Sequence, residues 1–66
     1  MKTLVLKGVE KWREYVFPEG DTYRIYKPTE LRIADSGSHR VCDEAGVWHY
    51  VTPGWRAIRW DGDLIA

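Results

Sequence analysis

The sequence predicts an all-β domain spanning residues 1–66, either a small barrel or a compact sandwich of about six to seven short antiparallel strands. Turn-forming residues recur along the chain, and the segments between them are rich in β-branched and aromatic residues. The turn signals lie at residues 18–20, 27–28, 35–38, 43–46, 53–54 and 61–62. Because so short a chain has a high surface-to-volume ratio, we expect a single domain with a thin core.

The N-terminal part contains one clear strand and one ambiguous segment. Residues 3–6 form a short apolar run that predicts the first strand. In residues 9–17, Val9, Trp12 and Val16 have the spacing of a short helix, whereas Tyr15 and Phe17 alternate as in a strand. We favour a strand near residues 11–17, because a tight Pro-Glu-Gly turn follows it, and keep a short helix as the alternative. Trp12 is predicted to be a core residue.

The middle of the chain is predicted to form a bend and a hairpin. Proline cannot donate a hydrogen bond to a sheet, so Pro28 should bend the chain between two strands. A three-residue loop at residues 36–38 would then place Ile33 opposite Val41, on the same face of the sheet. It would also place Asp35 opposite His39.

Two further turn signals follow. Residues 43–46, Asp-Glu-Ala-Gly, resemble a type I turn closed by a left-handed glycine. Residues 61–62, Asp-Gly, predict a two-residue hairpin that pairs residues 63–66 back against residues 57–60.

Residues 46–63 contain three of the four tryptophans and are predicted to form a hairpin around Pro53-Gly54. Strand alternation would then give this hairpin two different faces. The buried face would carry Val47, Val51, Ile58 and Trp60. The exposed face would carry Trp48, Tyr50, Trp55 and Arg59, which we predict to be the binding residues because Trp, Tyr and Arg dominate interface hot spots.

Two alternatives to this assignment stay open. Pro-Gly favours a type II turn that suits hairpins poorly, so the register could shift and exchange the faces of one strand. The tryptophans could also simply fill a small core, since large rings contribute much burial per residue. The test is the comparison of Trp55→Ala with Trp60→Ala, in which we expect Trp55→Ala to leave folding largely intact.

Charge and cysteine content limit the classes of partner. Ten basic and ten acidic residues give a formal net charge of zero, which disfavours nucleic acid and anionic membranes as partners. The single cysteine, Cys42, cannot form an internal disulfide, which favours a cytoplasmic location. The apolar run at residues 3–6 is far too short for a signal sequence or a membrane span.

The sequence contains no convincing catalytic, cofactor or metal motif. His39, Cys42, Asp43 and His49 superficially resemble a metal site, but His39 and Cys42 would point to opposite faces of a strand. The Asp-Ser-Gly-Ser-His stretch at residues 35–39 is better explained by local turns than by a catalytic triad. We therefore expect no cofactor, no metal ion and no enzymatic activity.

The predicted function is a non-enzymatic protein-binding or assembly module that uses an aromatic sheet face. Self-association, most simply as a homodimer, would compensate for the thin core. The alternative is a small barrel that binds single-stranded nucleic acid, since residues 23–27 and 55–60 interleave aromatic and basic side chains. A third hypothesis is that the chain is a small bacterial or phage protein with a regulatory or structural role.

Overall fold

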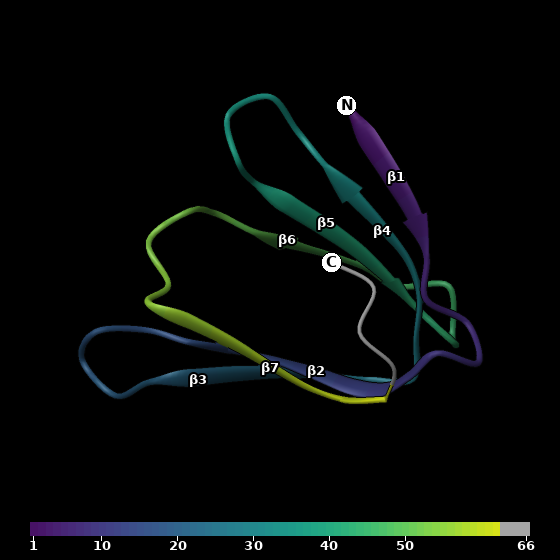
Figure 1. Cartoon of the computed structure of the whole chain (residues 1–66), viewed down its shortest axis with the longest axis horizontal. Coiled ribbons are helices and arrows are strands. Elements are labelled where there is room, and N and C mark those ends of the chain that lie inside the picture. Colours follow the sequence, from purple (N-terminus) through teal and green to yellow (C-terminus); the bar gives the residue numbers. More distant parts are fainter. Residues whose placement is uncertain (63–66) are drawn as a thin grey trace.

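The computed structural model describes residues 1–62 and contains seven strands in two antiparallel sheets. The strands are β1 (Lys2–Val5), β2 (Glu10–Val16), β3 (Thr22–Tyr26), β4 (Pro28–Ile33), β5 (His39–Asp43), β6 (Trp48–Val51) and β7 (Ala57–Gly62). Sheet A has the order β1-β4-β5-β6, and sheet B has the order β3-β2-β7. Figure 1 shows the sheets as two layers of an open sandwich. The predicted all-β fold is confirmed, in its sandwich form.

The ambiguous segment is strand β2, the central strand of sheet B. It pairs with β3 on one side and with β7 on the other, so its backbone groups are satisfied by neighbouring strands rather than within a helix. Arg13 and Tyr15 point into the sandwich and are fully buried, while Glu14 lies on the outer face of sheet B. The strand prediction is confirmed, and the helical alternative is wrong.

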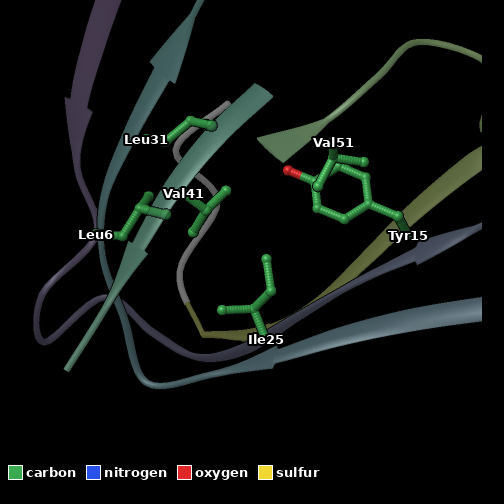
Figure 2. Close-up of a cluster of buried hydrophobic side chains, with 6 residues drawn as sticks. All are labelled: Leu6, Tyr15, Ile25, Leu31, Val41 and Val51. Carbon is green, nitrogen blue, oxygen red and sulfur yellow. The ribbon is translucent and has the colours of Figure 1, made fainter. Parts of the chain in front are cut away.

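The core lies between the two sheets and is small, as Figure 2 shows. Side chains from both sheets point into the core. Each sheet thereby buries the apolar face that it would otherwise expose to solvent. Its buried members are Leu6, Tyr15, Ile25, Leu31, Val41 and Val51. Five partly buried side chains pack around them: Leu4, Phe17, Ile33, Trp55 and Ile58.

The hairpin between β4 and β5 differs in register from the predicted one. The Ala34 amide donates to the Ser38 carbonyl at 2.9 Å, so the loop comprises residues 35–37 and not 36–38. Ile33 therefore faces His39 instead of Val41. The loop ends one residue earlier because Gly37, with a φ of 92°, takes the left-handed position that closes a three-residue loop. The shift is two residues, so the predicted faces of both strands are unchanged.

Two turn predictions are confirmed. In the β5–β6 turn, the Gly46 amide donates to the Asp43 carbonyl at 3.0 Å and the Asp43 amide to the Val47 carbonyl at 2.9 Å. At Pro28 the chain leaves sheet B and enters sheet A, with Lys27 at a φ of 51° completing the bend.

The predicted hairpin around Pro53-Gly54 is wrong. Strand β6 pairs with β5 in sheet A, whereas β7 pairs with β2 in sheet B. Residues 52–56 thus carry the chain from one sheet to the other, and the facing pairs predicted across this turn do not form. A Pro-Gly turn twists against the strands of a tight hairpin. In addition, Trp55 belongs to the segment of residues 52–56 and packs against the core, so this segment cannot form a tight exposed turn.

The predicted hairpin at Asp61-Gly62 is also wrong, because both residues belong to β7. Asp61 lies opposite Trp12 and Gly62 lies opposite Glu10, with an irregularity in the pairing between these two positions. Gly62 serves here as a strand glycine at a close backbone approach rather than as a turn residue. The predicted return strand, residues 63–66, lies outside the described residues.

Candidate functional site

The outer face of sheet A carries large side chains that the fold does not use for its core. Alternation along the strands turns Leu31, Val41 and Val51 inward, so the residues next to them point outward. Antiparallel pairing places Arg32 opposite Arg40 and Arg40 opposite Tyr50. We call the outward set formed by Arg32, Arg40, Trp48 and Tyr50 the arginine–aromatic face.

Each exposed ring of this face is paired with a guanidinium group. The Arg32 guanidinium lies 4.7 Å from the Trp48 ring centroid, and that of Arg40 lies 5.6 Å from the Tyr50 centroid. These distances are those of cation–π contacts, which join each guanidinium group to a ring on the same face. Trp48 is 47 % exposed and Tyr50 is 61 % exposed, so both rings remain accessible.

Further contacts fix the orientation of these side chains. The Tyr50 hydroxyl donates to the Ser38 hydroxyl at 3.2 Å, and Arg32 forms an ion pair with Glu30. Together with His49, which lies between Trp48 and Tyr50 on β6, the four residues line a shallow hollow of about 290 Å³. The face is therefore a preorganised surface that combines apolar rings with guanidinium donors.

The structure separates the four predicted binding residues. Trp48 and Tyr50 lie on the arginine–aromatic face. Trp55 does not, because it packs against the core with its ring centroid 5.0 Å from that of Tyr15. Arg59 lies on β7 in sheet B, where it forms an ion pair with Glu14 at 3.4 Å. The prediction that Trp55 and Arg59 lie beside Trp48 followed from the predicted hairpin, which is wrong.

The predicted buried set is also divided. Val51 is in the core and Ile58 packs against it, but Val47 is 52 % exposed and Trp60 is only partly buried. Val47 lies in the turn between β5 and β6, and it therefore does not belong to a strand that faces the core.

Sequence reasoning missed Arg32 and Arg40. The signal was present, since Arg32 stands between the apolar residues Leu31 and Ile33, and Arg40 directly precedes Val41. Alternation alone places both arginines on the outward face of their strands. Recognising the face as a unit also required knowing that β6, and not β7, lies next to β5.

The outer face of sheet B carries a second arginine–ring contact, with different chemistry. The Arg24 guanidinium lies 4.0 Å from the Trp12 ring centroid, and Trp12 is partly buried beneath it instead of belonging to the predicted core. Glu14 forms ion pairs with both Arg24 and Arg59. Both arginines of this face already contact a carboxylate, whereas the salt bridges among residues 1–62 do not include Arg40 of sheet A, so this face is less suited to binding an acidic partner.

A buried polar network connects the sheets and is shielded from solvent. Arg13 donates two hydrogen bonds to the Glu10 carboxylate, at 3.0 and 3.1 Å, and a third to the Tyr15 hydroxyl at 3.3 Å. The Tyr15 hydroxyl also lies within hydrogen-bond distance of His39 Nδ1, at 2.8 Å. Burial raises the pKa of Tyr15, whereas burial and the Arg13 charge lower the pKa of His39. The network is structural, since its side chains are buried.

The patterns that resembled catalytic or metal motifs have other structural roles. His39 faces the core network and pairs with Val51, whereas Cys42 lies on the opposite face of β5 and pairs with Trp48. Within residues 1–62 there is no group of three metal-ligating side chains. Asp35 contacts the N-terminal amine at 3.5 Å, so it does not converge with His39 in a triad.

Comparisons of the chain with protein-family models, with curated proteins and with solved structures gave no match. Residues 1–62 contain no helix with the length and apolarity that a membrane span requires.

Proposed function

We propose that the protein is a binding or assembly module whose arginine–aromatic face recognises an acidic segment of a partner protein. The observation that carries the proposal is the pairing of two accessible rings with two guanidinium groups on one rigid sheet face. Trp, Tyr and Arg are the residue types that contribute most binding free energy at protein interfaces.

The charges of the face support an acidic partner. Each guanidinium lies beside a ring, and an arginine in such a contact keeps N–H groups with which it can bind a carboxylate. Arg32 already contacts the Glu30 carboxylate, whereas the salt bridges among residues 1–62 do not include Arg40. A partner carboxylate would therefore be directed to Arg40, with apolar partner side chains against Trp48 and Tyr50.

Single-stranded nucleic acid is the second candidate. Its support is the same alternation of rings and arginines, since bases stack on aromatic side chains while arginines contact phosphates. It is the weaker candidate because nucleic-acid affinity depends on neutralising several phosphates, which a formal net charge of zero disfavours.

Photo-crosslinking from the face tests the proposal. Tyr50 is replaced by p-benzoylphenylalanine, and Tyr26 is replaced in the same way as a matched control, because it is 64 % exposed on the opposite sheet. After irradiation in the source cell, we expect protease-sensitive adducts from position 50 that are absent from position 26. Replacing Arg40 by Glu in the position-50 variant should reduce them.

Three results would contradict the protein-binding proposal: adducts sensitive to nuclease, the same adducts from both positions, or none from position 50. A protein adduct of twice the protein's own mass of 7.7 kDa would identify the partner as a second copy and assign the face to self-assembly. We also propose the cytoplasm as the compartment, since Cys42 is a free thiol.

A further inference from the structure

Tyr23, His49 and Asp43 form a hydrogen-bonded chain that bridges the edges of the two sheets. Tyr23 comes from β3 of sheet B, while His49 and Asp43 come from β6 and β5 of sheet A. The Tyr23 hydroxyl lies 2.7 Å from His49 Nδ1, and His49 Nε2 lies 2.8 Å from Asp43 Oδ2. This is the order of a nucleophile, a base and a group that orients the base.

The contacts of Asp43 determine where the protons lie. Its Oδ1 accepts hydrogen bonds from the Ala45 and Val47 amides, at 2.9 and 3.1 Å. The hydrogen bond with His49 and those two amides lower the pKa of Asp43, so the group is a carboxylate at neutral pH. A carboxylate can only accept, and therefore His49 Nε2 carries the proton. In neutral His49, Nδ1 is then the acceptor and the Tyr23 hydroxyl is the donor.

We propose that Tyr23 is an activated phenol that accepts acyl groups, with His49 as its general base and Asp43 orienting the imidazole. The phenolic oxygen attacks the carbonyl carbon of an activated acyl donor, and its proton passes to His49 Nδ1. The bond between the acyl carbon and the leaving group then breaks. The leaving group takes up a proton, directly from His49 or through solvent, which returns His49 to its neutral form.

The exposure of the three side chains fits this role. Tyr23 is 45 % exposed, so a donor molecule can reach it, whereas the His49 and Asp43 side chains are each only 19 % exposed. The alternative is that the chain is purely a clamp between the sheets. In that case the hydrogen bond would engage the hydroxyl and make it less reactive than other exposed tyrosines.

N-acetylimidazole separates the two possibilities, because it acetylates phenols and releases imidazole. The folded protein is treated briefly near neutral pH, and acetylation at each tyrosine is measured by peptide mass spectrometry. Tyr26 and Tyr50 are internal references, since both are more exposed than Tyr23, and the fully buried Tyr15 reports unfolding. We expect Tyr23 to react at least about tenfold faster than either reference, a modest part of what a general base can supply.

Two variants test the roles of the partners. His49→Gln removes the base and should bring the Tyr23 rate down to that of Tyr26, while Asp43→Asn should reduce it partially. Tyr15 must stay unlabelled in each variant for the comparison to report on the folded state. The proposal is overturned if Tyr23 in the unaltered protein reacts no faster than Tyr26 and Tyr50, whether or not the variants fold. It is also overturned if folded His49→Gln keeps the fast reaction.

Discussion

Trp55 packs its indole against the rings of Tyr15 and His39, with centroid separations of 5.0 and 4.7 Å. Trp60 lies partly exposed on β7 and is not among the side chains that pack against the core. At the scale of single residues, the position of Trp55 inside the sandwich reverses the expectation that it would be the dispensable tryptophan of the pair.

We therefore expect Trp55→Ala to be the more destabilising of the two substitutions. Removing the indole leaves a cavity beside Tyr15, which should lower the free energy of unfolding by about 3 kcal/mol. Trp60→Ala should cost less, because Trp60 is not among the side chains that pack against the core. Thermal melts of both variants show which substitution lowers stability more. A larger loss of stability for Trp60→Ala would contradict this placement of Trp55.

At the scale of elements, the predictions that succeeded rest on local chemistry. The Asp43–Gly46 turn, the Pro28 bend and the alternation within β6 are each determined by residues close together in the sequence. Trp48 and Tyr50 were correctly placed together for that reason. Trp55 and Arg59 were not, because their position depends on whether β7 joins β6 or β2, and that choice is made by long-range packing.

Gly62 illustrates such a long-range constraint and gives a test of the β2–β7 pairing. A Cβ atom at this position would overlap the Val9 carbonyl group and lie 2.9 Å from Glu10 Cα, at a φ of 148°. Gly62→Ala should therefore displace the end of β7 and lower the denaturation midpoint clearly.

Gly20→Ala is the matched control. Gly20 also has a positive φ, 93°, but a Cβ atom there meets open space, so its cost should be limited to backbone strain of about 1 kcal/mol. Equal midpoints for Gly62→Ala and Gly20→Ala would refute the close approach of β7 to Val9.

At the scale of the whole molecule, the buried network joins the sheets and makes stability depend on pH. Arg13 can only donate to the Tyr15 hydroxyl, and this hydroxyl lies 2.8 Å from His39 Nδ1. Burial and the charge of Arg13 lower the pKa of His39, so His39 is neutral in the folded protein at neutral pH and its Nδ1 can accept from Tyr15. The folded state binds fewer protons at this site than the unfolded chain does.

Stability should consequently be constant above the unfolded histidine pKa of about 6.5 and fall as the pH drops toward the lower pKa of folded His39. Urea midpoints measured between about pH 7.5 and pH 5 report this loss. His39→Gln keeps an acceptor for Tyr15 but has no proton to bind, so its midpoint should change less over the same range. An unchanged pH dependence in that variant would assign the effect to another group.

The switch of sheets at residues 52–56 also means that the two sheets join parts of the chain at different sequence separations. Strands β4, β5 and β6 pair through two short loops, so their contacts close at little entropic cost. Sheet B is different, because its β2–β7 pairing joins Val16 to Ala57 at one end and Glu10 to Gly62 at the other. Because non-local pairing slows folding, we expect the docking of β7 beside β2 to be the slow step in forming sheet B.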